Sequence, residues 1–299
     1  MNESAPKVKS YFSLIKFSHT VFALPFALIG FFLALTMSTT RFSWSLLGLV
    51  ILCMVFARSA AMGFNRYIDR RYDAANPRTA IREIPAGIIS TRNALFFVIL
   101  NCALFILTTW FINPICFQLS PVALIIILGY SYTKRFTALC HLILGIGLSL
   151  APIGAFLAVT GKFNIMPLMY SFAVLCWVSG FDMIYALQDE EFDRSQNLRS
   201  IPVWLGKKRT LILSSFLHLG SALLVIQAGV YAGFGILYWI GASIFILLLI
   251  YQHFIVKPHD LSRINLAFMT LNGIASIIFS VFVISELWFR HLGTTFHGF

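Results

Sequence analysis

The 299-residue sequence predicts an all-α polytopic membrane protein. Hydrophobic residues make up 59% of the chain, charged residues only 11%, and the mean hydropathy is +0.85. A soluble domain carries roughly 25% charged residues, whereas here the apolar residues form runs of about 20, the length that crosses a bilayer as a helix. We therefore expect one integral membrane domain over residues 1–299, surrounded by the lipid bilayer, and no protein partner is implied.

Nine apolar runs are candidate membrane spans, separated by turn residues such as Asn113-Pro114 and Gly161-Lys162. The first run follows three lysines, is long for the apolar core of a signal peptide, and has no cleavage motif of small residues behind it, so we assign it as a span. In chain order the predicted spans are 17–37, 43–64, 93–112, 115–133, 138–160, 165–187, 210–229, 234–256 and 266–289.

Positive charge is distributed unevenly over the segments between these spans. If the N-terminal segment 1–16 is cytoplasmic, the segments on that side hold eighteen of the 22 lysines and arginines. This bias follows the positive-inside rule, so we expect the N-terminus in the cytoplasm and the C-terminus outside. The same rule explains the formal net charge of +11, and no nucleic-acid partner is implied.

Acidic residues are rare in this chain, and eight of the eleven fall in two short clusters on the predicted cytoplasmic side. Acids are costly near a bilayer and are kept there mainly where they have a function. In the first cluster Asn65, Asp69 and Asp73 have i, i+4, i+8 spacing, which places them along one face of a helix over about 12 Å. We expect this helix to continue from the second span to Asn76-Pro77, where proline would end it.

The second cluster repeats this spacing with Tyr185, Asp189 and Asp193, and Asp182 precedes them on nearly the same helical face. Two rows of carboxylates on one side of the membrane could be two halves of one site. Hard oxygen ligands suit Mg²⁺, which usually binds together with phosphate groups. The sequence therefore predicts Mg²⁺ ions that bridge a diphosphate and neutralise the charge that builds on it as it leaves.

Basic side chains surround both acidic clusters. Arginine pairs with phosphate oxygens in a bidentate manner and lysine acts as a point charge, so a diphosphate could be held among them. The alternative is that the acids simply pair with these cations at the membrane surface. The residues concerned are Arg66, Arg70, Arg71, Arg78, Arg82, Lys134, Arg135 and Arg199.

Arg58 lies inside the second predicted span, seven residues before Asn65 and on the same helical face. A charge at this depth generally faces a cavity or a partner. We expect Arg58 to line a cavity, where it pairs with Asp182 or binds an acidic substrate. The alternative is a side chain near the span edge that extends to water.

Four motifs in this order resemble those of the UbiA-type intramembrane prenyltransferases. Each motif alone is weak, but the ordered set is specific and extends over nearly the whole chain. Residues 65–73 fit N-x-x-x-D-x-x-x-D, 78–87 resemble R-T-x-x-R-x-x-P-x-G, 130–135 resemble Y-x-x-x-K-R, and 189–193 fit D-x-x-x-D.

The resemblance implies an all-helical fold around a central cavity that opens to the cytoplasmic side. It also implies Mg²⁺-dependent transfer of a polyprenyl group from its diphosphate to an aromatic ring. We further expect Tyr185 to bind substrate, and Asp182 or Asp189 to orient the acceptor or take its ring proton. By matching motifs, the metal–diphosphate would be bound by Asn65, Asp69, Asp73, Asp189 and Asp193. Phosphate oxygens would be held by Arg78, Arg82, Lys134 and Arg135.

The chain departs from the family pattern at Asn197, where glycine is common, although asparagine also tolerates left-handed backbone angles. Residues 192–202 resemble the branch that prenylates a dihydroxynaphthoate-type acid for menaquinone, whereas the commoner acceptor is 4-hydroxybenzoate, for ubiquinone. Both are aromatic acids with an activating hydroxyl, and one sequence does not separate them. The resemblance also implies the bacterial cytoplasmic (inner) membrane.

Three other functions are weighed against this interpretation. A membrane transporter could line a cavity with Asp and Arg, but its substrate site is expected at the midplane rather than at one face. A CDP-alcohol phosphotransferase would need a D-G-x-x-A-R motif, which the sequence lacks. A related transferase acting on another acceptor, such as haem, is excluded only weakly.

Overall fold

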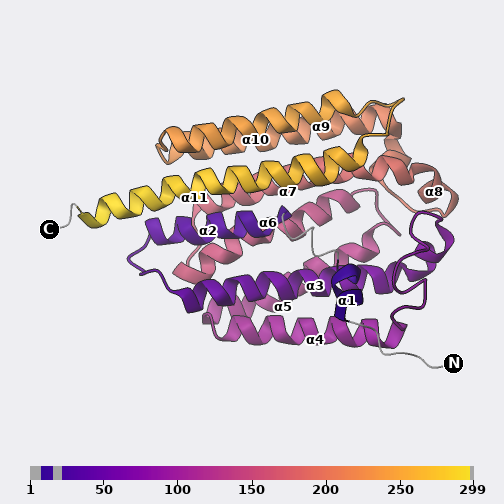
Figure 1. Ribbon diagram of the computed structural model, residues 1–299, viewed down its shortest axis with the longest axis horizontal. Coiled ribbons are helices and arrows are strands. Elements are labelled where there is room, and N and C mark those ends of the chain that lie inside the picture. The colour runs from indigo at the N-terminus through magenta and orange to yellow at the C-terminus, as the bar shows by residue number, and fades with distance from the viewer. Residues whose placement is uncertain (1–7, 16–21, 297–299) are drawn as a thin grey trace.

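The computed structural model describes residues 8–15 and 22–296, and residues 1–7, 16–21 and 297–299 lie outside the described part of the chain. Within the described ranges the regular secondary structure is all helical, which confirms the predicted fold class. Figure 1 shows the long helices side by side, with α9 and α10 at one edge of the bundle and α4 at the opposite edge. The short helix α1 (Val8–Leu14) precedes them.

Eight helices of the described chain are long and apolar enough to cross a membrane. The first predicted span corresponds to the shorter apolar helix α2 (Leu24–Thr36), and its beginning, 17–21, lies outside the described residues. The helix count is therefore roughly as predicted. The longer helices are α3 (Trp44–Ala75), α4 (Thr91–Trp110), α5 (Pro114–Thr133), α6 (Cys140–Thr160), α7 (Ile165–Ala186), α9 (Ile201–Tyr231), α10 (Ile236–Ile255) and α11 (Asn272–Phe296), which follows the π-helix η3 (Leu266–Leu271).

Helix α3 extends well beyond the predicted span and carries Asn65, Asp69 and Asp73 of the first acidic cluster. Its last residue is Ala75, and Asn76 caps it with an extended backbone in front of Pro77. The predicted end of this helix is confirmed. Proline disfavours the helical conformation of the residue before it, which accounts for the stop at Asn76.

The i, i+4 spacing suggested that the second acidic cluster lies on one continuous helix, but the structure shows a break within it. Helix α7 ends at Ala186, a 3₁₀ turn spans Leu187–Asp189, and the short helix α8 (Glu190–Ser195) follows. Helix α9 also begins earlier than predicted, at Ile201, and contains non-helical backbone at Gly206. These breaks allow the chain to turn across the end of the bundle before it re-enters the apolar region.

Two glycines let α6 approach its neighbours closely. A Cβ atom on Gly145 of α6 would lie 2.3 Å from Ser179 Oγ and 2.8 Å from the carbonyl oxygen of Leu175, both on α7. A Cβ atom on Gly30 of α2 would lie 2.1 Å from the carbonyl oxygen of Pro152 on α6. Small residues permit such close packing between membrane helices. Only glycine fits these two crossings, so they fix α2, α6 and α7 relative to one another.

A buried polar cluster joins α7, α10 and the π-helix. Asn272 Oδ1 accepts hydrogen bonds from Trp177 Nε1 (2.8 Å) and Gln252 Nε2 (2.9 Å), and Asn272 Nδ2 donates to the carbonyl oxygen of Ala267 (3.0 Å). A π-turn frees carbonyl groups that need such partners. Asn272 therefore stabilises the π-helix, which lies next to the second acidic cluster.

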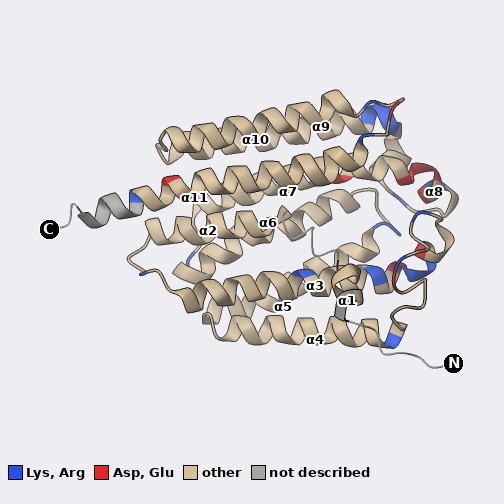
Figure 2. Cartoon of the chain, viewed as in Figure 1, with Lys and Arg blue, Asp and Glu red and all other residues tan. Residues whose placement is uncertain are grey.

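Charged residues gather at the end of the bundle that carries α8, as Figure 2 shows. The middle of the bundle is almost entirely tan, which marks uncharged residues, and the blue segment on α3 is a visible exception. The acidic clusters, which are about 110 residues apart in the sequence, thus share one end of the molecule with most of the described basic residues.

Candidate active site

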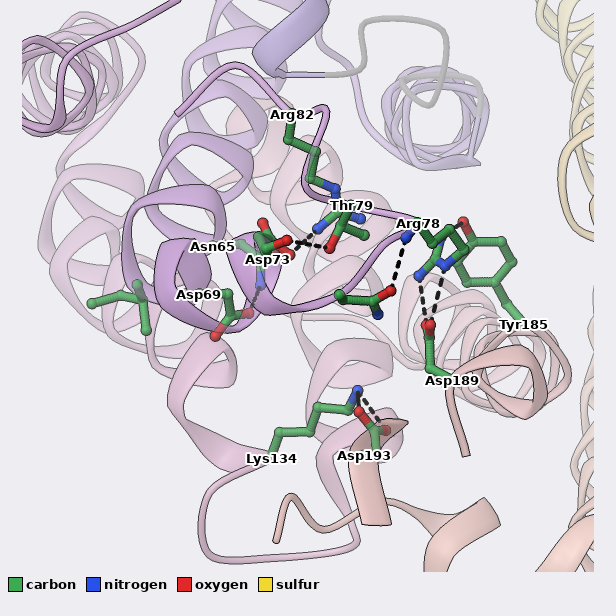
Figure 3. A network of polar contacts seen from close by, with 12 residues as sticks. Asn65, Asp69, Asp73, Arg78, Thr79, Arg82, Lys134, Tyr185, Asp189 and Asp193 are labelled. Carbon is green, nitrogen blue, oxygen red and sulfur yellow. Dashed lines mark hydrogen bonds and ion pairs between the residues drawn. The ribbon is translucent and has the colours of Figure 1, made fainter. Parts of the chain in front are cut away.

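The first acidic cluster lies along the last three turns of α3. Asn65 Nδ2 donates a hydrogen bond to Asp69 Oδ2 at 3.0 Å, and Asp69 Oδ1 is 2.9 Å from Arg135 Nη2. One turn later, Asp73 Oδ1 is 2.5 Å from Arg82 Nη1, while the other carboxylate oxygen of Asp73 is buried without a partner. The predicted spacing therefore does place all three side chains on one face (Figure 3).

The loop after α3 folds back over this face. Asn76 Oδ1 accepts a hydrogen bond from the backbone N–H of Arg78, and Thr79 Oγ1 donates to the carbonyl oxygen of Asp73. These bonds direct Arg78 away from α3 and leave Arg82 on Asp73. Leu14 of α1 supports the far side of the loop by packing with Ile84 and Ile89.

Arg78 reaches the second acidic cluster. Its Nε and Nη2 atoms donate to the two oxygens of Asp189 at 3.1 and 2.6 Å, and its Nη1 donates to the hydroxyl of Tyr185 at 3.2 Å. The fork of the guanidinium matches a carboxylate with two parallel bonds, and it matches phosphate in the same way. Figure 3 shows this pair bridging the two clusters.

The loop between α5 and α6 bridges the clusters a second time. Lys134 Nζ is 2.8 and 2.7 Å from the two oxygens of Asp193, which is almost fully buried, while the next residue, Arg135, binds Asp69. The carbonyl oxygen of Lys134 accepts a hydrogen bond from the backbone N–H of Arg199. Two consecutive basic residues thus hold opposite halves of the site.

Asn197, which departs from the family pattern, forms the turn that follows α8. Asn197 has φ +53°, and it is the one non-glycine residue with positive φ among the described residues. Asparagine tolerates this conformation better than other side chains, so the substitution keeps the turn that returns Arg199 to the α5–α6 loop.

Neighbouring acidic side chains raise the pKa values of two basic residues at the site, Lys134 and Arg78. Burial alone lowers the pKa of the Lys134 ammonium, but the neighbouring Asp193 carboxylate more than offsets this and raises it. For Arg78, burial again acts downward, and Asp189 with Tyr185 raises the pKa of the guanidinium. Each of the four aspartates of the two motifs is paired with one basic side chain.

The oxygen atoms at this site fit Mg²⁺, although they do not converge on one point. Among the described residues, no group of three or more His, Cys, Asp and Glu side chains is arranged to hold a metal ion. The physical reason is that each aspartate faces a cation instead. The unpartnered, buried oxygen of Asp73 and the adjoining amide and carboxylate oxygens form the hard donor set that Mg²⁺ prefers.

An apolar cavity of about 390 Å³ lies between α3, α5 and α6, within the membrane-spanning part of the bundle. Arg58 and Tyr130 line it, as do small or apolar residues such as Ala57, Ile127 and Ala151. The expectation that Arg58 faces a cavity is confirmed. Of the two partners expected for Arg58, Asp182 is not the one observed: no ion pair in the described structure joins them, and Asp182 binds a histidine instead.

That histidine was not identified from the sequence. His141 Nδ1, in the first turn of α6, is 2.6 Å from Asp182 Oδ2 on α7, while His141 Nε2 is buried without a partner. A lone histidine at the start of an apolar run carries no motif. Only the packing of α6 against α7 brings it to Asp182.

The model of the UbiA prenyltransferase family matches residues 23–274. The chain belongs to the UbiA prenyltransferase family. It is therefore a prenyltransferase, and its apolar helices make it an integral membrane protein.

Relatives of this UbiA-family chain carry a common name. The 4-hydroxybenzoate octaprenyltransferase of Francisella tularensis subsp. mediasiatica is 30% identical over 236 residues, which are 78% of this chain and 82% of the relative. The protein of the same name from Tolumonas auensis is 28% identical over 238 residues, which are 80% and 83% of the two chains.

Solved structures of the UbiA family share the fold. A UbiA homologue from Aeropyrum pernix K1 has a TM-score of 0.81 and 33% identity, with 90% of this chain and 98% of the homologue covered. A UbiA homologue from Archaeoglobus fulgidus, whose structure contains DMAPP and Mg²⁺, has a TM-score of 0.75 and 21% identity over 93% and 99% of the chains.

Proposed function

We propose that this prenyltransferase transfers a polyprenyl group from its diphosphate to a ring carbon of an aromatic acid during respiratory quinone biosynthesis. The observation that carries the proposal is the pairing of two carboxylate motifs with four cations beside an apolar cavity. Carboxylates suit metal ions, cations suit phosphate, and the cavity suits a hydrocarbon chain. Few other substrates combine these three chemistries.

The diphosphate would bind where the four ion pairs now meet. Arg78, Arg82, Lys134 and Arg135 would exchange their carboxylate partners for phosphate oxygens, which present similar acceptor geometry. The carboxylates so freed, together with Asn65, would hold Mg²⁺, which supplies charge neutralisation for the diphosphate as it leaves. Support for the metal comes from the Archaeoglobus fulgidus homologue, which binds DMAPP or GPP with Mg²⁺.

The prenyl chain would occupy the apolar cavity. Most of its lining residues are small or aliphatic, and the surrounding helices would exclude water from the allylic cation that forms when the carbon–oxygen bond breaks. Tyr130 is the one tyrosine in this lining and lies in the last turn of α5, shortly before Lys134. Its electron-rich ring can stabilise a passing positive charge.

The acceptor would be an aromatic acid whose carboxylate binds Arg58 and whose electron-rich ring attacks the allylic carbon. The names of the Francisella and Tolumonas relatives favour 4-hydroxybenzoate. The resemblance of residues 192–202 favours a dihydroxynaphthoate-type acid. Asp182 lies on α7, one helical turn before Tyr185 on the approach to the second motif, and would take the ring proton.

The membrane orientation belongs to the same proposal. The positive-inside distribution supports a cytoplasmic N-terminus, with the acidic clusters at the cytoplasmic face and the C-terminus outside. A bacterial inner membrane agrees with the bacterial relatives. Polyprenyl diphosphate could then enter from the bilayer while its charged end stays at the aqueous surface.

Prenyl transfer by membranes that contain the protein tests the proposal. We would supply polyprenyl diphosphate and Mg²⁺ with either 4-hydroxybenzoate or 1,4-dihydroxy-6-naphthoate, with Asp69→Ala and Asp189→Ala as controls. Metal-dependent product from one acid, lost in both variants, supports the proposal and selects the acceptor. No product from any aromatic acid, with folded protein, contradicts it and favours a transferase for another acceptor or a transporter.

A further inference from the structure

The pair formed by His141 and Asp182 is not explained by diphosphate binding. His141 Nδ1 and Asp182 Oδ2 are 2.6 Å apart, and the side chains are 3% and 22% exposed, respectively. Asp182 thus has one oxygen held from behind by the histidine, while part of its carboxylate remains accessible. Neither residue contacts the four cations that hold the aspartates of the two motifs.

Close contact between α6 and α7 brings this pair together. His141 and Gly145 lie one turn apart on the same face of α6, and Ser179 and Asp182 lie one turn apart on the facing side of α7. Because a Cβ atom on Gly145 would collide with Ser179 Oγ and with the Leu175 carbonyl, the two helices are in contact at this level. That contact lets the imidazole reach the carboxylate directly, without an intervening water.

Asp182 lies close to the groups that would surround an aromatic acceptor. The Tyr130 hydroxyl is within electrostatic reach of Asp182, Asp69, Arg66 and Arg58. Of these, Tyr130 and Arg58 line the apolar cavity. Tyr130 therefore links the cavity, where the ring would lie, with both Asp182 and Asp69 of the first carboxylate motif.

We propose that His141 is a positioning residue that holds Asp182 as the base for the ring proton of the aromatic acceptor. The inference rests on the proposed prenyl transfer. In that reaction the ring carbon bonds to the allylic carbon, and the allylic carbon–oxygen bond breaks with its electron pair going to the diphosphate. The ring proton then passes to Asp182, and the carbon–hydrogen electron pair restores the aromatic ring.

His141 contributes by keeping one oxygen of Asp182 in a hydrogen bond, so that the other oxygen points to the acceptor. The Nδ1–H group, which charged imidazole carries and neutral imidazole can carry, can donate to Asp182 both before and after the carboxylate takes the proton. The proton leaves to water once the product has been released. A carboxylate without this partner would sample several rotamers, and proton removal would slow.

The test compares His141→Ala, His141→Gln and Asp182→Asn with the control His253→Gln, which changes a histidine on α10 that pairs with His218 rather than with Asp182. We would use the acceptor on which the wild-type protein is active, with and without deuterium on its unsubstituted ring carbons. The measured quantities are kcat, KM for both substrates, and the primary deuterium isotope effect on kcat. Hydrolysis of polyprenyl diphosphate without acceptor reports on folding and on the diphosphate site.

We expect His141→Ala to lower kcat about 10- to 100-fold, since general bases contribute about 10² to 10⁴ and this residue acts indirectly. KM for the prenyl diphosphate should stay within about twofold. The isotope effect should rise above the wild-type value, because proton removal becomes slower. His141→Gln should recover most of the rate through its amide donor, and Asp182→Asn should lose more than His141→Ala.

An unchanged kcat in His141→Ala overturns the inference, and so does a lower kcat with an unchanged isotope effect, because a merely structural role has that signature. If His141→Ala does not fold, the test uses His141→Gln and Asp182→Asn instead. Isotope effects equal to that of the wild type in both of these variants would overturn the inference. Wild-type protein that prenylates no aromatic acid rejects the proposed function together with this inference, whereas an active wild type with an equally active His141→Ala rejects the inference alone.

Discussion

Phe268 stacks on Tyr185, with the two ring centroids 4.1 Å apart and their planes tilted by 28°. Phe268 belongs to the π-helix, and the hydroxyl of Tyr185 accepts a hydrogen bond from Arg78. The C-terminal part of the bundle thereby supports the arginine that binds the second acidic motif. π-Turns occur frequently at functional sites, and here the turn presents an aromatic ring to the candidate site.

Replacing Phe268 by alanine should weaken diphosphate binding without unfolding the protein. An aromatic pair contributes about 0.5–1.5 kcal/mol beyond its buried area, so KM for the prenyl diphosphate should rise about 2- to 10-fold as Tyr185 and Arg78 lose their support. Steady-state kinetics measures this. Phe216→Ala, on the exposed face of α9, is the matched control. Equal KM values for the two variants would refute the support role.

Substituting Arg78 by lysine should weaken binding of the prenyl diphosphate even though the positive charge is retained. Lysine keeps the positive charge but cannot make the two parallel bonds that Arg78 makes with Asp189. We expect KM for the prenyl diphosphate to rise by about tenfold, which is roughly the 1.4 kcal/mol expected for one lost charge-assisted bond. Arg71→Lys serves as control. A wild-type KM in Arg78→Lys would contradict a bidentate role.

Neutralising Asp73 should abolish most of the transfer activity. Asp73→Asn keeps the shape of the side chain but removes a charged oxygen ligand for Mg²⁺, so we expect kcat to fall by at least about 100-fold, and excess Mg²⁺ to restore part of it. Glu191→Gln is the control, because Glu191 is an exposed acid on α8 near the same site. A similar loss in both variants would indicate general electrostatics rather than metal binding.

Adding a methyl group at Gly145 should destabilise the fold, and adding one at Gly154 should not. Both glycines lie within α6, but a Cβ atom on Gly145 collides with α7, whereas one on Gly154 has no neighbour within 4 Å. Overpacking costs about 1–3 kcal/mol, so Gly145→Ala should lower the thermal midpoint in detergent. Gly154→Ala should match the wild type or exceed it, because alanine favours helix. A Gly145→Ala midpoint equal to that of Gly154→Ala would show that α6 and α7 are not in tight contact.

The sequence predicted those features that depend on local pattern. Apolar runs identified the helices, the spacing of Asn65, Asp69 and Asp73 placed them on one face, and Pro77 marked the end of α3. The break at Leu187–Asp189 was missed because i, i+4 spacing is equally compatible with a continuous helix. The choice of partners, such as Lys134 with Asp193, depends on how distant loops fold together, which no periodicity records.

The same distinction explains why His141 was overlooked. Its neighbours in the sequence are apolar, and its partner Asp182 is 41 residues away. The signal that could have suggested it was a pair of small residues, Gly145 and Ser179, each one turn from a titratable residue on a long apolar helix. Such a pattern indicates close helix packing, but it does not reveal which two helices meet.

The pairing of every motif aspartate with a cation has a consequence for how the substrates cooperate. Mg²⁺ alone must compete with a guanidinium or ammonium for each carboxylate, and a diphosphate alone must compete with a carboxylate for each cation. When both bind, Mg²⁺ frees the cations that the diphosphate needs, and the diphosphate frees the carboxylates that Mg²⁺ needs. Metal and diphosphate affinities should therefore be linked, and each should strengthen the other by the same factor. In the absence of prenyl diphosphate, the free protein would keep its two acidic motifs neutralised and only weakly sensitive to cellular Mg²⁺.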